Sequence, residues 1–158
     1  VELFGQLCHD EETFRQARRG VGFVFQDADD QLFCPTVAED VAFGPRNLGK
    51  SADEAHEIVH RTLDALKIEH LESRVTHNLS GGEKRLVALA TVMAMKPKLL
   101  ILDEPTSGLD PLQIIGIREL LQSLASTKKI IFSTHILQEV RPVTDGVVII
   151  NDGKLVAA

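Results

Sequence analysis

Residues 99–105 read Leu99-Leu100-Ile101-Leu102-Asp103-Glu104-Pro105, an apolar run that ends in two adjacent carboxylates. Four consecutive aliphatic residues predict a strand buried on both faces of a parallel sheet. Such a strand delivers its last residues to the carboxyl edge of the sheet, where open α/β folds bind their ligands. There Asp103 is suited to hold a metal ion, and Glu104 to orient or deprotonate a water molecule, which is the acidic half of a nucleotide-hydrolysing site. Taken alone, the stretch is more typical of a buried strand followed by an acidic turn.

Two further predicted strands also end in polar side chains. Residues 21–25 form an apolar run that leads into the amide of Gln26, and the run that begins at Ile130 leads into His135. Because the carboxyl ends of parallel strands meet at one edge of a sheet, we expect Gln26 and His135 to lie near the acid pair.

Two glycine-containing turns complete the pattern. Ser80, Gly81 and Gly82 precede an apolar-periodic run, so they predict a helix whose first turn offers bare N–H groups to a phosphate. After the acid pair, a Ser-Gly-Leu turn leads to Asp110. Each turn is a weak signal by itself, since a plain helix cap looks the same. The order of all these motifs along one chain is much more specific.

This order resembles that of the ATP-binding cassette (ABC) ATPases, and the resemblance runs almost from end to end. It implies an α/β fold, namely a P-loop NTPase-type parallel sheet core with an inserted α-helical subdomain, and it implies ATP and Mg²⁺ as ligands. By this resemblance Gln26 is the Q-loop glutamine, which contacts Mg²⁺ and senses the membrane partner, while Asp103 supports the same metal. Glu104 is the catalytic base, and His135 is the switch histidine that contacts the γ-phosphate.

The same resemblance implies partner subunits. Ser80, Gly81 and Gly82 match the family signature, which grips the γ-phosphate bound by the opposite subunit of a dimer, and Asp110 matches the loop aspartate at that interface. The expected partners are therefore a second ABC ATPase subunit, identical or different, and transmembrane subunits that contact the Q-loop region. We expect the protein at the cytoplasmic face of the membrane.

One part of such a site is missing from the sequence pattern. A P-loop is expected after the first strand of the core, and a strand, loop, helix and return strand need roughly 30 residues or more. Only 25 residues precede Gln26, and residues 1–20 contain no G-x-x-x-x-G-K-[ST] pattern. We therefore expect that the core is incomplete at its N-terminus, and that this chain alone binds ATP weakly or not at all.

Residues 44–51 do match the P-loop pattern letter for letter, as Gly-Pro-Arg-Asn-Leu-Gly-Lys-Ser. The residues around them favour helices instead: Thr36 with Glu39, and Ser51 with Glu54, have the spacing of capping boxes. Proline inside the match also removes a backbone donor from a loop whose role is to offer N–H groups. We interpret the match as a coincidence.

The chain divides into three stretches of different character. In residues 1–35, residues 1–5 are predicted as an edge strand, followed by a polar linker to Arg19 and then by the strand before Gln26. The chemistry of residues 36–95 is helical, with an apolar face over residues 52–68. Residues 96–158 return to the core, with a helix over residues 112–126 between two buried strands and a hairpin at the C-terminus.

Composition limits the remaining possibilities. The chain has 158 residues and a formal charge of −6, which argues against a nucleic-acid-binding surface because phosphate binding needs clustered cations. The two cysteines, Cys8 and Cys34, lack the spacing of a metal site and suit a reducing compartment. No apolar run reaches the length of a membrane span, so a role at a membrane needs a partner.

The segment from Gln26 to Pro45 most closely resembles the ATPases of energy-coupling-factor importers for cobalt, nickel and vitamins. Residues 113–120, 133–140 and 148–151 are more similar to exporter-type ABC ATPases. The resemblance therefore implies an ATP-hydrolysing subunit of an importer, with an exporter as the alternative. The motifs are also compatible with a non-hydrolysing module that lends its signature residues to a complete partner, and with a soluble family member in DNA repair or translation.

Overall fold

A three-stranded parallel sheet forms the centre of the fold, in the order β3-β4-β5. The computed structural model describes residues 1–136 and 146–157. Strands β3 (Val21–Val24), β4 (Leu99–Leu102) and β5 (Lys129–Phe132) are aligned so that their last residues lie side by side. The residues that follow all three strands therefore emerge at one edge, which confirms the predicted parallel α/β core.

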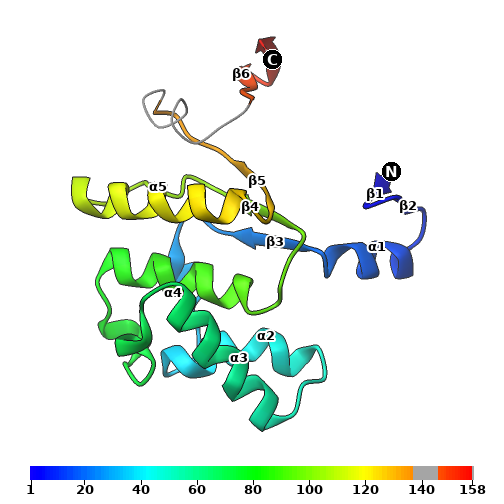
Figure 1. The fold of residues 1–158 in the computed structure, drawn as a ribbon. Helices are drawn as coiled ribbons and strands as arrows, with labels where there is room; N and C mark the ends of the chain where they lie inside the picture. The colour runs from blue at the N-terminus through cyan, green and yellow to red at the C-terminus, as the bar shows by residue number, and fades with distance from the viewer. Residues whose placement is uncertain (137–145, 158) are drawn as a thin grey trace.

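Helices account for most of the chain between β3 and β4 (Figure 1). They are α2 (Val37–Asn47), α3 (Ala52–Ala65) and α4 (Gly81–Met93), with short 3₁₀ turns η1 (Ala28–Asp30), η2 (Glu69–Leu71) and η3 (Thr76–Asn78). Helix α5 (Pro111–Ala125) connects β4 to β5. The capping boxes predicted at Thr36 with Glu39 and at Ser51 with Glu54 are both confirmed.

The N-terminal segment differs from the prediction of a strand and a polar linker. Strands β1 (Glu2–Leu3) and β2 (Gln6–Leu7) form a small antiparallel pair, and α1 (Glu11–Arg18) follows. This helix has no apolar stripe to detect, since Ala17 is its buried residue. It is stabilised locally instead, by a capping box between Asp10 and Thr13 and by a pair in which Arg15 donates to Glu12 at 2.7 Å.

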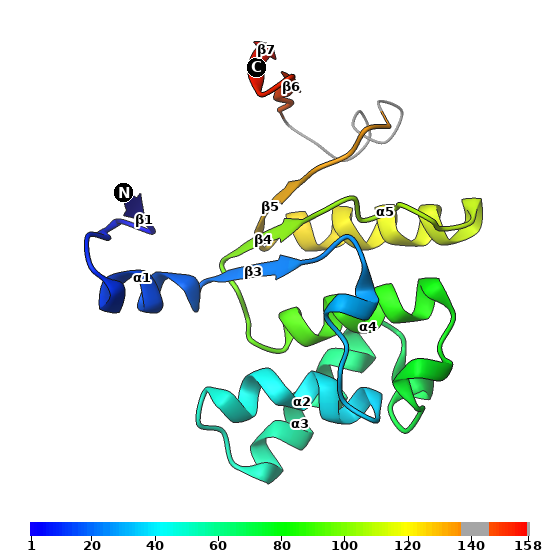
Figure 2. The same cartoon turned by 180° about the vertical axis from the view of Figure 1, so that it is seen from behind.

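The C-terminal hairpin is confirmed by β6 (Ile149–Asn151) and β7 (Lys154–Ala157), which pair antiparallel. Figures 1 and 2 show this hairpin standing apart from the helices, beyond the end of β5. In the described part of the chain, no helix combines the length and the apolar character needed to cross a bilayer.

The sheet is covered by helices on one face only, which corrects the prediction that the strand at Leu99–Leu102 is buried on both faces. Leu100 and Leu102 of β4 are buried in the same apolar cluster as residues of α4 and α5. On the other face Ile101 is half-buried, while Phe23 and Ile131 are 42% and 57% exposed. Strand β5 is consequently a half-exposed edge strand of the described sheet, and residues 146–150 line a cavity beside its outer face.

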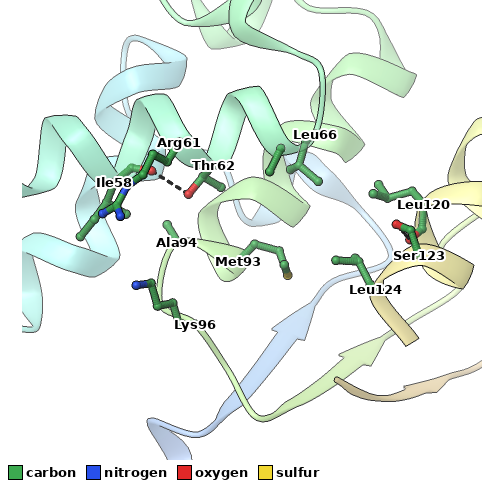
Figure 3. A pocket seen from close by; sticks show the side chains of 11 residues that line it. Ile58, Arg61, Thr62, Leu66, Met93, Ala94, Lys96, Leu120, Ser123 and Leu124 are labelled. Carbon is green, nitrogen blue, oxygen red and sulfur yellow. Dashed lines mark hydrogen bonds between the residues drawn. The ribbon is translucent and has the colours of Figure 1, made fainter. Parts of the chain in front are cut away.

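A pocket of about 260 Å³ lies between α3, α4 and α5 (Figure 3). Its walls are mainly apolar, including Leu66, Met93 and Leu124, with Arg61 and Lys96 toward one end. None of its lining residues belongs to the edge of the sheet where the acid pair emerges, so this pocket is separate from the candidate site.

Candidate functional site

The acid pair occupies a strained turn directly after β4. Glu104 has a φ of 44°, in the left-handed region that residues with a side chain seldom adopt. Its main-chain N–H donates to Oγ of Ser133 at 3.0 Å, and that hydroxyl in turn donates to Oδ1 of Asp103 at 2.6 Å. Ser133 follows β5, so one side chain from the neighbouring strand fixes both acids. Backbone strain of this kind concentrates at functional sites.

Glu104 pairs with the predicted histidine. Nδ1 of His135 lies 2.9 Å from Oε2 of Glu104, although 31 residues separate them in sequence. The Glu104 side chain is 18% exposed and that of His135 is 72% exposed, so the pair lies at the surface with the acid beneath the imidazole. The parallel register thus brings together two groups able to accept or hold a proton.

Gln26 and Asp103 line one polar cavity of about 570 Å³ at the same edge. Asp27, Arg85 and Ser107 also contribute to its walls. The described residues contain no cluster of three or more His, Cys, Asp or Glu side chains suited to a metal. Mg²⁺ is usually bound by one or two carboxylates, with phosphate and water oxygens completing its shell. The carboxylate of Asp103 and the amide oxygen of Gln26 fit that requirement.

Arg85 is a residue of this cavity to which the sequence pattern assigns no role. Its Nη1 donates to the main-chain oxygen of Glu104 at 2.6 Å, and its Nη2 donates to the main-chain oxygen of Gln26 at 2.7 Å. Partial burial lowers the pKa of the guanidinium, while the carboxylates of Asp27 and Glu104 oppose that change. Both acceptors are far from Arg85 in sequence. A basic residue in the first turns of a helix is common, so the sequence near Arg85 could not predict these contacts.

Helix α4 also holds the loop that follows β3. Nε2 of Gln31 donates to the main-chain oxygen of Ala88 and to Oγ1 of Thr91, both at 2.8 Å. Nζ of Lys84 donates to Oδ1 of Asp29 at 2.6 Å. The loop carrying Gln26 is therefore attached to α4 at several points.

The two glycine-containing turns lie against each other, and of their residues only Ser107 is among those that line the cavity. Ser80 caps α4, and its main-chain N–H donates to Glu83, which lowers the pKa of that carboxyl. A Cβ on Gly82 would lie only 2.3 Å from Nε2 of Gln113, in the first turn of α5. Asp110 caps α5 by accepting from the N–H of that same Gln113.

Ser80, Gly81, Gly82 and Asp110 are all absent from the lining of the cavity that holds Asp103. Ser80 and Gly81 are exposed, as is Asp110. The structure thus brings Gln26, Asp103, Glu104 and His135 to one rim. It leaves Ser80 and Gly81 exposed elsewhere, while Gly82 is buried against Gln113.

The stretch that matches a P-loop does not form one. Its first residues, Gly44 to Asn47, belong to α2, and Ser51 caps α3 by accepting from the N–H of Glu54. Nζ of Lys50 donates to Glu54 at 2.8 Å, which together with the Ser51 N–H lowers the pKa of Glu54 to about 2. The interpretation of this match as a coincidence is confirmed.

Comparison with known proteins gives consistent results. The pattern of the family described as ABC transporter matches residues 1–107. A putative ABC transporter ATP-binding protein of Brucella suis is 46% identical over 160 residues, covering 100% of this chain and 65% of that protein. The energy-coupling factor transporter ATP-binding protein EcfA of Methanococcus maripaludis is 44% identical over 151 residues, covering 95% of this chain and 54% of its own length.

A solved structure is also similar. The cbiO1 protein of Clostridium perfringens, described as part of the ABC transporter complex cbiONQ, matches with a TM-score of 0.87 and 39% identity. The match covers 94% of this chain and 60% of that one. This chain therefore spans about half to two thirds of the length of the relatives it matches.

Proposed function

This chain belongs to the ABC transporter family, and we propose that it supplies the acid pair and histidine of an ATP-hydrolysing site in an energy-coupling-factor importer. The proposed cargo is a metal ion or a vitamin. Similarity to EcfA proteins and to cbiO1 supports this branch of the family. Of the segments more similar to exporter-type ATPases, residues 137–140 lie outside the described residues.

One observation carries the proposal: Gln26, Asp103, Glu104 and His135 emerge from the carboxyl ends of three adjacent parallel strands, with the imidazole 2.9 Å from the Glu104 carboxylate. A buried strand that merely ended in an acidic turn would not need a strained Glu104 held by a side chain of the neighbouring strand.

Each side chain has a proposed role in water attack on the γ-phosphate. Glu104 accepts a proton from the attacking water, and its partly covered carboxylate is directed by His135. Asp103 and Gln26 are the residues that would hold Mg²⁺, which when bound neutralises phosphate charge. The Ser133 hydroxyl keeps the two acids in separate orientations, because it accepts from the Glu104 N–H while donating to Asp103.

The proposed partners follow from two exposed surfaces. The exposed Ser80 and Gly81 at the start of α4, followed by the buried Gly82, are offered to nucleotide bound by a second ATPase subunit. Phe33 and Phe43 stack edge to face and remain 62% and 46% exposed beside an apolar hollow of about 310 Å³. We assign this hollow to a transmembrane subunit, and we propose that the protein acts at the cytoplasmic face of the membrane.

A second candidate function is a signature-donating module that does not itself hydrolyse ATP. It is favoured by one observation: Ser80 and Gly81 are exposed at the start of α4 and do not line the cavity that Asp103 lines. In this case Ser80 and its neighbours would serve a nucleotide held entirely by the partner.

One set of variants separates the two functions. The chain is purified with the transporter subunits that bind it, and ATP hydrolysis is compared for wild type, Glu104→Gln, Ser80→Ala and the control Glu119→Gln. Glu119 is exposed on α5, away from the cavity. If this chain hydrolyses ATP, Glu104→Gln lowers turnover at least about a hundredfold and Glu119→Gln does not.

The second candidate function gives a different pattern. A signature-donating module loses activity with Ser80→Ala but keeps it with Glu104→Gln. Absence of ATP hydrolysis from the wild-type complex would contradict both functions.

A further inference from the structure

Arg85 joins two segments that are far apart in sequence. Nη1 and Nη2 of its guanidinium donate to the main-chain oxygens of Glu104 and Gln26, which are 19 and 59 residues away. Arginine suits such a task because its planar guanidinium presents several donors in a fixed geometry. The two acceptors are the carbonyls of a proposed base and of a proposed metal-binding amide. Arg85 thus contacts two site residues through their backbones, leaving their side chains available.

The contact with Glu104 bears directly on its strained conformation. A left-handed φ costs a residue with a side chain roughly 1–2 kcal/mol, so the surroundings must maintain it. The Glu104 N–H is held by Ser133 on one side, and its main-chain oxygen is held by Arg85 on the other. Glu104 is therefore fixed at both of its backbone polar groups, by side chains from β5's end and from α4.

The neighbouring Lys84 provides a natural comparison. It lies on the same helix and also reaches the loop after β3, through Asp29 at 2.6 Å. Within residues 1–136 and 146–157, Lys84 makes no hydrogen bond with the acid pair, whereas Arg85 reaches the loop and the acid pair at once. Variants of Lys84 and Arg85 can therefore distinguish the effect of attaching the loop after β3 from the effect of attaching the acid pair.

We propose that Arg85 is a positioning residue that fixes the backbones of Gln26 and Glu104 relative to the helix beginning at Ser80. It lies one turn beyond the signature residues, so a displacement of α4 would act on both sides of the cavity through a single side chain. The consequence for ATP hydrolysis rests on the proposed function, but the positioning itself does not.

Amide hydrogen exchange of the purified chain, followed residue by residue by NMR, tests the positioning without nucleotide. The variants are Arg85→Gln, Arg85→Lys and the control Lys84→Gln. The reporters are the N–H groups of Glu104 and Phe25, which donate to Ser133 and Gln31 respectively. Arg85→Gln is expected to accelerate exchange at both reporters at least about tenfold, because it removes two hydrogen bonds from a charged donor.

The controls make the result specific. Lys84→Gln is expected to leave the Glu104 amide unchanged. Arg85→Lys keeps the charge but offers a compact ammonium that cannot reproduce the two-armed contact, so at least one reporter still exchanges faster. Wild-type exchange at both reporters in Arg85→Lys, or equal acceleration of every amide including those within α3 in Arg85→Gln, would overturn the proposal.

If Arg85→Gln fails to fold, the wild-type chain decides the question. In NMR spectra recorded at low temperature, we expect separate, slowly exchanging Nη signals for Arg85, because both of its Nη atoms are hydrogen-bonded. The Nη signals of the exposed Arg19 should average to one. Averaged Arg85 signals contradict the proposal.

The assembled complex adds a kinetic measurement. There Arg85→Gln is expected to lower kcat at least about tenfold while KM for ATP stays within about twofold. Faster amide exchange in Arg85→Gln, combined with a wild-type complex that does not hydrolyse ATP, rejects only the proposed function. Hydrolysis by the wild-type complex with unaltered amide exchange in Arg85→Gln rejects only the role of Arg85.

Discussion

The helical region and the sheet of this molecule are built differently. Helices α2, α3 and α4 pack against one another, and Leu63 of α3 is fully inaccessible. The sheet is covered on one face, and Ile131 on its other face is 57% exposed. The inner face of the sheet shares one buried cluster with the helices, whereas its outer face is less protected. The candidate site sits at the edge of this sheet, where strain and solvent access are compatible with chemistry.

The largest effect expected from this difference concerns two aliphatic truncations. Leu63→Ala should lower the free energy of unfolding by about 2–5 kcal/mol, because it removes packed atoms and leaves a cavity. Ile131→Ala should change it by about 0.5 kcal/mol or less, as for other surface positions. Urea unfolding followed by circular dichroism measures both values. Equal losses for the two variants would show that the outer face of the sheet is covered in solution.

A smaller effect concerns the loop between β3 of the sheet and α2 of the helical region, which contains Cys34. Burial, together with the neighbouring carboxylate of Asp40, raises the pKa of the Cys34 thiol to about 11. Since the thiolate is the reactive form, only about one Cys34 thiol in a thousand is ionised at pH 8. Alkylation by iodoacetamide, read at Cys34 by peptide mass spectrometry, should therefore rise about tenfold for each pH unit between pH 7 and pH 10.

Asp40 provides the matched variant for this measurement. Its buried carboxylate accepts from the N–H groups of Phe33 and Cys34 and from the hydroxyl of Thr76. Asp40→Asn removes the charge at nearly constant shape, so the pKa of Cys34 should fall and its alkylation at pH 8 should become faster. In urea the thiol should react with an ordinary pH dependence. If the alkylation rate of Cys34 in the native wild type levelled off near pH 9, the pKa of its thiol would not be raised by burial and Asp40 as described.

The helix starts of the molecule were predictable because their signals are local. Thr36, Ser51 and Ser80 each have a glutamate three residues later, and each makes the reciprocal pair of hydrogen bonds. The parallel strands could likewise be predicted from apolar runs that alternate with helical segments. The edge at which Gln26, Glu104 and His135 meet follows from the same topology.

Two features could not be predicted from the sequence. One depends on contacts between residues far apart in the chain, and the other on which face of the sheet the helices cover. Arg85 acquires its role from two carbonyls, 19 and 59 residues away. The exposure of Ile131 depends on which helices pack against the sheet, and an apolar run alone does not indicate whether one or both faces are buried.

The smallest expected effect compares two adjacent glycines at the junction of the two regions. A Cβ on Gly81 would meet no atom within 4 Å, whereas one on Gly82 would lie 2.3 Å from Nε2 of Gln113. Gly81→Ala should stabilise the chain by up to about 1 kcal/mol, since alanine is the better helix former. Gly82→Ala displaces Gln113, whose Oε1 accepts from the Asp110 N–H at 3.2 Å.

Loss of that cap costs about 1 kcal/mol, which should cancel the gain in helix propensity, so Gly82→Ala is expected to be neutral or slightly destabilising. In a Gln113→Ala background the obstruction is gone, and both glycine substitutions should then stabilise the chain to a similar extent. Urea midpoints of the single and double variants measure this coupling. If Gly82→Ala stabilises the wild-type background as much as Gly81→Ala does, the starts of α4 and α5 are not packed together in solution, and the signature residues move independently of the turn that carries Asp110.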